Sequence, residues 1–394
     1  MSIAFPFRSV FLLASLALTG AIAIRVVDDR WMSTTELGAE RTDGPPVIGV
    51  IVPDSVAQPA CDALRIASEK ALGESQGRRP PELLIRRAGT GRAAYAAVAE
   101  RLVRDQGACV LVVACDSNER SAIESVASRH GVACVSVLPT VAPSSSLAID
   151  LGGLPNQRFG PVIAWGLEAL GRRAALVTGS RPEEHAGRLF ARDLLKASAS
   201  DLVADVLIAA GDETSLDAAA AEIARGKPSM VIVSADEELA TAMAAALRRA
   251  GVTPDVAPCV HVGRMPSRHT QHAAALTGDY IAFDGFDLGD DTAPGALTVG
   301  VTVGIELAEQ AIRRVGVADG RAIAAVMRDM SISTEHGPIR IDRLTGAAWR
   351  GVNVARVGSG VELVTVMTSG LRRPRRMSEL LGLVELTAGA GGRT

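Results

Sequence analysis

The strongest constraint on the fold of this chain is an alternation of short apolar runs with amphipathic segments, which begins at Val47 and continues through most of the sequence. Runs of four to eight apolar residues are typical of buried strands, and apolar residues at helical spacing are typical of surface helices. Such an alternation predicts parallel strands covered by helices on both faces, which is the α/β class. The expected strands are Val47–Val52, Glu82–Arg87, Cys109–Ala114 and Ala133–Val137 in a first half, and Ala174–Val177, Leu202–Ile208, Met230–Val233, Cys259–Val262 and Gly278–Phe283 in a second half.

Helices are expected between these strands, and a few further elements should close the fold. The long helix predicted near residue 300 should return to the first half, and three last strands should complete the sheets. The expected helices are Ala60–Leu72, Gly91–Gln106, Ser117–His130, Glu183–Ala197, Leu216–Arg225, Glu237–Ala250, Leu297–Arg314 and Arg321–Met330, and the closing strands are Ile339–Asp342, Val352–Val357 and Val361–Val366.

The stretch Gly152–Ser180 marks the crossing between the two halves. Pro155 suits the first turn of a helix, and Gly171 suits its end. A complete α/β half precedes this stretch and a second one follows it. We therefore predict two Rossmann-like lobes with a hinge and a ligand cleft between them: residues 47–153 with 288–332 form lobe 1, residues 154–287 with 333–368 form lobe 2, and residues 369–394 form a flexible basic tail.

Composition narrows the function classes. The chain has 394 residues and a net charge of −3 with both signs interspersed, which argues against a nucleic-acid surface. Only 3% of the residues are aromatic, so the core must consist of aliphatic side chains. The five cysteines are widely spaced and include no CxxC pair, which indicates small buried hydrophobic residues rather than disulfides or a zinc ribbon.

The N-terminus resembles a targeting segment. Arg8 precedes an apolar run from Val10 to Ile24, and Ala21–Ala23 resembles a small-x-small cleavage site. We interpret residues 1–24 as a signal peptide, with an uncleaved anchor or a misassigned start as alternatives, and residues 25–46 as a linker. This predicts a periplasmic or other extracytoplasmic location.

Polar motifs follow three of the predicted strands. Asp116–Glu119, Ser180–Glu183 and Ser234–Glu237 each combine a possible N-cap oxygen with a glutamate three residues later, the pattern of a capping box. Ligands of open α/β sheets bind at the carboxyl ends of the strands, where helix N-termini offer free N–H groups. The motifs therefore predict either a site for a carboxylate, amide or urea group, or helix caps alone.

Several segments resemble the type I periplasmic-binding-protein fold. Gly153-Leu154-Pro155-Asn156-Gln157, followed by Pro161 and Trp165, carries the resemblance, together with residues 112–120, 133–140 and 334–342. More narrowly, they resemble the branch that contains the amide-binding regulator of amidase operons and the urea or short-amide binding proteins of ABC transporters.

The resemblance implies particular ligand contacts. Ser117 stands where the family places a serine that binds the ligand amide, and Thr140 where a threonine contacts it. Cys115 and Leu138 stand at two places where the family has tyrosines. Further candidates come from the strand ends and late aromatic residues; they are Ser55, Asp116, Ser180, Arg181, Asp236 and Phe283. Arg181 could pair with a carboxylate, so an amino acid competes with an amide as the expected ligand.

Other site chemistries fit less well. Gly89–Ala94 matches a dinucleotide fingerprint, but it follows the second strand rather than the first and lacks the acidic residue expected after it. His261, His269 and His272 could bind a metal on a helix, but Pro266 between them favours a polar surface loop. We therefore expect no catalysis, no metal and no cofactor.

The sequence as a whole predicts an extracytoplasmic solute-binding protein that traps a small polar ligand, such as a short amide, urea or an amino acid, between its lobes. The expected partner is the permease of an ABC transporter. A ligand-sensing regulator that acts through a sensor partner, and an enzyme on the same scaffold, are the alternatives.

Overall fold

The computed structural model describes residues 44–56, 61–62, 65–66, 80–138, 145–209, 214–262, 275–284, 296–334, 337–359 and 362–375. Pro45–Thr394 forms one compact unit. The predicted signal peptide, Thr140, and most of the expected helix Ala60–Leu72 lie outside the described residues. Among the described helices, none is both long and apolar enough to cross a membrane.

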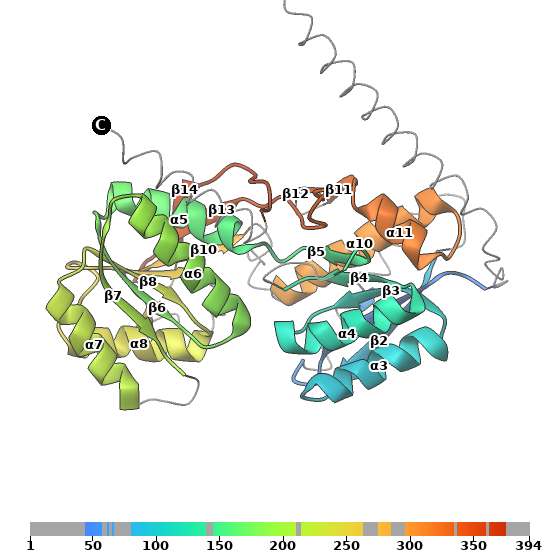
Figure 1. Ribbon diagram of the computed structural model, residues 1–394, viewed down its shortest axis with the longest axis horizontal. Helices are drawn as coiled ribbons and strands as arrows, with labels where there is room; N and C mark the ends of the chain where they lie inside the picture. Colours follow the sequence, from blue (N-terminus) through green and yellow to red (C-terminus); the bar gives the residue numbers. More distant parts are fainter. Residues whose placement is uncertain are drawn as a thin grey trace, which may run out of the picture. The chain divides into compact units, whose positions relative to one another are not determined.

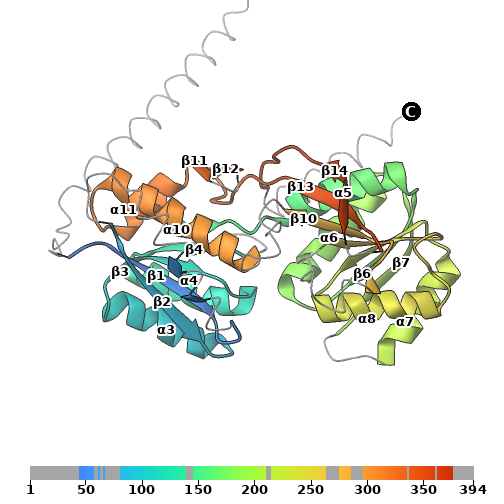
Figure 2. The same ribbon diagram turned by 180° about the vertical axis from the view of Figure 1, so that it is seen from behind.

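The first sheet has five parallel strands in the order β2-β1-β3-β4-β5. Helices α3 and α4 cover one face and α10 and α11 cover the other, as Figure 1 and Figure 2 both show. The long helix after the second half therefore returns to the first sheet, which confirms that expectation. The elements are β1 Val47–Pro53, β2 Glu82–Ala88, α3 Arg92–Arg104, β3 Ala108–Val113, α4 Ser117–His130, β4 Ala133–Ser136, β5 Ala148–Asp150, α10 Ala296–Val315 and α11 Gly320–Met327.

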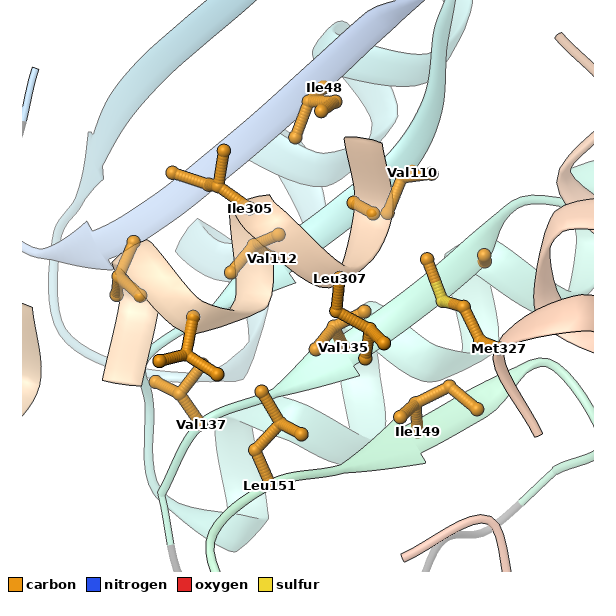
Figure 3. Packing of buried hydrophobic residues seen from close by; sticks show 14 of the residues in the cluster. Ile48, Val110, Val112, Val135, Val137, Ile149, Leu151, Ile305, Leu307 and Met327 are labelled. Atoms are coloured by element: carbon orange, nitrogen blue, oxygen red, sulfur yellow. The ribbon is translucent and has the colours of Figure 1, made fainter. Parts of the chain in front are cut away.

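The face under α10 and α11 is a continuous aliphatic core. Figure 3 shows Ile305 and Leu307 of α10 packed against the side chains of β3 and β4, with Met327 of α11 beside Ile149. All of these side chains are almost completely buried. Burying a side chain of this size contributes about 1.5–3 kcal/mol, so α10 is fixed to this sheet by its apolar face.

The second sheet has seven strands in the order β14-β13-β10-β9-β8-β6-β7. Helices α5 and α6 cover one face, and α7 and α8 cover the other. The five strands from β7 to β10 are parallel, whereas β13 and β14 are antiparallel additions at one edge. The elements are α5 Pro155–Ala169, β6 Arg173–Thr178, α6 Pro182–Ala197, β7 Asp201–Leu207, α7 Thr214–Gly226, β8 Met230–Ser234, α8 Glu237–Arg249, β9 Cys259–Val262, β10 Tyr280–Asp284, β13 Val352–Val357 and β14 Leu363–Thr368.

Two short strands were not predicted, because one has only three residues and the other has a single apolar residue among four. These are β5 and β11 Ser331–Thr334, and β11 pairs with β12 Gly337–Arg340 in a separate hairpin. The predicted boundaries place residues 333–348 in lobe 2. Ile339 and Ile341 instead join the hydrophobic cluster under α10 and α11, because the hairpin packs on the first sheet.

The Pro-Asn-Gln motif at the start of α5 ties together segments that are distant in the sequence. The buried amide of Gln157 accepts a hydrogen bond from Leu154 N (2.8 Å) and donates to Ala348 O (2.9 Å) and Arg372 O (2.8 Å). The side chain of Asn156 donates to Arg373 O (3.0 Å) and accepts from Arg375 N (3.0 Å). The motif therefore joins the crossing between the two sheets to two later segments of the chain.

Asp342 makes a second connection near this crossing. Burial alone would raise the pKa of its carboxyl group, but hydrogen bonds from the Thr345 backbone, from Arg373 and from the Thr345 hydroxyl lower the pKa below its usual value. Arg373 Nε lies 2.7 Å from Asp342 Oδ2. The sequence predicted a flexible tail from residue 369. Arg373, one of the first basic residues of that tail, is instead hydrogen-bonded to Asp342.

Gly320 is required where α11 meets the first sheet. A Cβ at this position would lie 2.5 Å from Gly131 O and 2.7 Å from the Cα of Val132. Because backbone atoms cannot rotate away, we expect Gly320→Ala to lower the free energy of unfolding by about 2 kcal/mol. Urea denaturation would measure the change.

The matched control is Gly160→Ala. Gly160 lies inside α5, and outside its own helix no atom would lie within 4 Å of its added Cβ. This variant should change the free energy of unfolding by less than about 1 kcal/mol, because alanine loses less conformational freedom than glycine does, while Pro161 restricts the residue before it. Equal effects of the two substitutions would contradict the packing described here.

Candidate ligand-binding site

Helix α4 begins directly after β3 and brings two predicted residues to the carboxyl end of the first sheet. Asp116 is the N-cap residue, with extended backbone dihedrals, but its side chain forms no capping hydrogen bond. Ser117 is the first residue of α4, and its hydroxyl donates to Glu183 Oε2 at 3.1 Å. Ser117 and Glu183 follow strands of different sheets, so this hydrogen bond joins the carboxyl ends of β3 and β6.

At the start of α6, the glutamate of the capping box is Glu184 and not the predicted Glu183. The N-cap residue is Arg181, one residue later than predicted, and its backbone N–H donates to Glu184 Oε2 (3.0 Å). The guanidinium of Arg181 also donates to Glu184 Oε1 from Nε (2.9 Å) and Nη2 (2.6 Å). Burial alone would lower the pKa of Arg181, but these hydrogen bonds and the charges of Glu184, Glu183 and Asp116 raise it. Arg181 is therefore held by its own helix and does not extend as a free cation.

The structure assigns other roles to two of the remaining candidates. Asp236 caps α8, because its Oδ1 accepts the Leu239 N–H at 2.9 Å. Phe283 is 2% exposed and packs with Ile281 and Ala355 in a core cluster. We therefore correct the prediction for Phe283, since a side chain enclosed by aliphatic neighbours cannot form the wall of an open site.

Ser55 and Ser180 are both exposed in the turns that follow β1 and β6. They remain candidates by position, because both turns lie at carboxyl ends of parallel strands.

Gly91, within the sequence that matches a dinucleotide fingerprint, is the N-cap residue of α3. Its φ of 91° lies in a region that favours glycine, so the backbone of this turn accounts for the glycine.

Two residues near Ser117 were not selected from the sequence. Glu183 was predicted to be the glutamate of a capping box. Glu184 takes that role instead, and Glu183 accepts the hydrogen bond from Ser117. Tyr95 of α3 is 5% exposed, and burial followed by the charges of Cys115, Glu119 and Asp116 raises its pKa to about 12. Only its distance from these groups in space, which the sequence does not contain, could have identified it.

The first turns of these helices are acidic. Glu119 lies in the first turn of α4, Glu183 and Glu184 in that of α6, and Glu237 and Glu238 in that of α8. Carboxylates at a helix N-terminus offset the partial positive charge that would otherwise attract an anion. The described residues around Ser117 therefore favour a ligand that brings N–H donors or a positive charge to Glu183 and Asp116.

Sequence comparison places the chain in a family. Residues 47–362 match the model of the periplasmic binding protein family, which is most of the chain. The chain belongs to this family. A comparison with curated proteins found no match.

Solved structures show the same fold at low sequence identity. A leucine-binding protein from Thermotoga maritima is 16% identical, with a TM-score of 0.70 over 82% of this chain and 98% of that protein. A solute-binding protein from Rhodopseudomonas palustris in complex with 4-hydroxybenzoate is 13% identical, with a TM-score of 0.72 over 85% and 100%. A branched-chain amino acid binding protein from Streptococcus pneumoniae in complex with isoleucine is 15% identical, with a TM-score of 0.67 over 84% and 100%. At these identities the similarity establishes the two-lobed fold and not the ligand.

Proposed function

We propose that this protein is an extracytoplasmic solute-binding protein that delivers an amino acid, or a short amide or urea, to the permease of an ABC transporter. The observation that carries the choice of ligand is the Ser117–Glu183 hydrogen bond, within an acidic set of residues at the strand ends. The Ser117 hydroxyl can donate to a carbonyl or carboxylate oxygen or accept from an N–H group, and Glu183 can accept from an ammonium or amide N–H.

An α-amino acid fits this set better than an aromatic acid does. The leucine- and isoleucine-binding relatives carry ligands with both a carboxylate and an ammonium group. The benzoate-type ligand of the Rhodopseudomonas palustris protein offers a carboxylate without an N–H donor. Arg181 is the cation near this set and is shared between Glu184 (2.6 Å) and Glu183 (3.8 Å), so a ligand carboxylate without an N–H donor would meet more negative than positive charge. Amides and urea are the second choice, since they offer N–H donors without a carboxylate.

A thermal-shift screen tests this proposal. The ligands should include branched-chain and polar amino acids, acetamide, urea, short-chain carboxylates and 4-hydroxybenzoate. We expect a raised unfolding midpoint with at least one amino acid or amide, because a ligand that binds only the folded state stabilises it. Uniformly flat responses, or a response to aromatic acids alone, would overturn the ligand assignment.

Ser117→Ala should weaken the binding of any ligand found in the screen about tenfold, which corresponds to the loss of one hydrogen bond to a polar ligand. Ser121→Ala is the matched control, because Ser121 lies on the same helix and its hydroxyl donates to Asn118 O (2.8 Å). Isothermal titration calorimetry would measure both variants. Unchanged affinity in Ser117→Ala would remove this residue from the site.

A ligand sensor without transport remains the second candidate. Both functions use the same binding step, so uptake separates them. Deleting the gene should lower uptake of the identified ligand if the protein serves a permease. Normal uptake with loss of a ligand-dependent response would instead favour the sensor. Turnover of the ligand, abolished by replacing one polar residue of the site, would favour an enzyme.

A further inference from the structure

Three buried side chains that could each bind a metal ion lie close together beside strands β9 and β10 of the second sheet. They are the thiol of Cys259, the imidazole of His261 and the carboxylate of Asp279, and their ligand atoms all lie within 4.8 Å of one another. Cys259 is 4% exposed, His261 5% and Asp279 1%. Cys259 is the first residue of β9, so the cluster lies at the amino end of the strand, opposite the edge that carries the candidate ligand site.

The strand geometry explains how the three side chains converge. Cys259 and His261 are two residues apart on β9 and therefore point to the same face of the sheet, with Cys259 packed in the cluster of α7 and α8. Val260 and Val262 point to the opposite face, under α5 and α6. Asp279 precedes β10, which runs parallel to β9 with Tyr280 opposite Val260.

Asp279 is held in place by two hydrogen bonds. Its Oδ1 accepts the backbone N–H of Cys259 at 3.0 Å, and its Oδ2 accepts from Arg248 Nη2 of α8 at 2.9 Å. A carboxylate oxygen has lone pairs beyond those that these bonds use. Arg248 therefore orients Asp279 in the way that outer hydrogen bonds orient the ligands of metal centres.

His261 has no equivalent partners. Its two ring nitrogens are buried, and neither forms a hydrogen bond within the described part of the chain. Nε2 lies 3.7 Å from Asp279 Oδ2, which is too far for a hydrogen bond. Burying an imidazole ring without hydrogen-bond partners costs stability. A metal ion bound to a ring nitrogen would offset this cost, because it would accept the lone pair of that nitrogen.

We propose that Cys259, His261 and Asp279 form a binding site for a zinc-type divalent cation, which links β9 to the start of β10. Sulfur, imidazole nitrogen and carboxylate oxygen are the ligands that Zn²⁺ prefers, whereas Ca²⁺ and Mg²⁺ prefer oxygen alone. Ligand atoms of a tetrahedral zinc ion lie roughly 3.5 Å apart, so side-chain shifts of about 1 Å would let the three side chains coordinate the ion, and a water molecule would supply the fourth ligand. On binding, the Cys259 thiol releases its proton to solvent, and the thiolate, a neutral imidazole lone pair and a carboxylate oxygen coordinate the cation.

Burial determines how the site is filled. Burial and the charge of Asp279 raise the pKa of Cys259 well above its usual value, and Arg248 acts in the opposite direction. Because α8 covers the cluster, we expect the cation to enter most readily during folding, as in other proteins whose metal binding is coupled to folding.

Cobalt binding to the full chain tests the site. The reduced protein, freed of metal with a chelator, is titrated with Co²⁺, and it is also refolded from urea with one equivalent of Co²⁺. We expect one bound ion, a thiolate-to-cobalt charge-transfer band, and displacement of the cobalt by Zn²⁺. Zinc-loaded protein should unfold at a temperature a few degrees higher than the metal-free protein. Absence of the charge-transfer band in both preparations would overturn the proposal.

Variants separate this site from other cobalt ligands. Cys259→Ser should abolish the charge-transfer band, and His261→Gln should weaken cobalt binding at least about 100-fold. Cys134→Ser is the matched control, because Cys134 is an equally buried strand cysteine of the first sheet, and this variant should bind as the parent protein does. A band that persists in Cys259→Ser, or that disappears in Cys134→Ser alone, would contradict the assignment. The zinc-dependent rise of the unfolding midpoint in the parent protein keeps the test decisive if one variant fails to fold.

Discussion

Arg120→Met is expected to lower the free energy of unfolding by about 3–5 kcal/mol, the range for breaking a buried ion pair from one side. Arg120 on α4 lies between two buried carboxylates, with Nε 3.3 Å from Glu124 Oε1 and Nη1 3.6 Å from Asp150 Oδ2. All three side chains are at least nine-tenths buried. Removing the arginine leaves two buried carboxylates without its compensating positive charge.

Urea denaturation followed by circular dichroism would measure this effect. Arg249→Met is the control, since Arg249 on α8 pairs with Asp217 at 2.7 Å on an exposed surface. Exposed pairs contribute less than about 1 kcal/mol. A loss in Arg120→Met no larger than in the control would show that the buried cluster does not stabilise the fold.

Gln157→Leu is expected to cost about 3 kcal/mol or more. Leucine has nearly the volume of glutamine, but it leaves Leu154 N and Ala348 O without the hydrogen bonds that Gln157 supplies, whereas Arg372 O keeps a hydrogen bond from Arg350 N. Each of the two buried groups that loses its partner costs about 1–3 kcal/mol. Urea denaturation followed by circular dichroism would measure the loss.

Asn156→Ala is the control for this substitution. Asn156 forms two hydrogen bonds with the segment after residue 372, but these are exposed, so water can replace the lost side chain. We expect a loss below about 1 kcal/mol. If both variants lowered the free energy of unfolding equally, the hydrogen bonds of the buried Gln157 amide would not stabilise the segment between the two sheets more than exposed ones do.

The helices and strands could be predicted from the sequence with small errors at their ends. The expected helix Ser117–His130 and strand Cys259–Val262 have the observed bounds. Apolar spacing reports which face of an element is buried, and this signal is contained within a single element. The short strand β5 escaped because three residues carry no period.

The candidate site was predictable by region but not by contact. The three polar motifs do start helices at the carboxyl ends of strands. The sequence could not show that Ser117 contacts Glu183, or that Phe283 faces the core. His261 was included both in the predicted strand Cys259–Val262 and in a histidine cluster expected in a surface loop, and the structure confirms the strand for His261, which is buried in β9. The burial of this strand is decided by its neighbours β8 and β10.

The sequence by itself determined the α/β class, the positions of the strands and helices, and the aliphatic nature of the core, because periodicity and residue volume act locally along the chain. Only the tertiary structure decided the pairing of Arg120 with Asp150, the three contacts of Gln157, and the meeting of Cys259, His261 and Asp279. Apart from the Leu154 contact of Gln157 and the neighbouring pair Cys259 and His261, these contacts join residues that are 20 to 215 positions apart. The geometry of these contacts depends on the order and register of the strands. Residues far apart in the sequence set that order and register together, so no local pattern contains it.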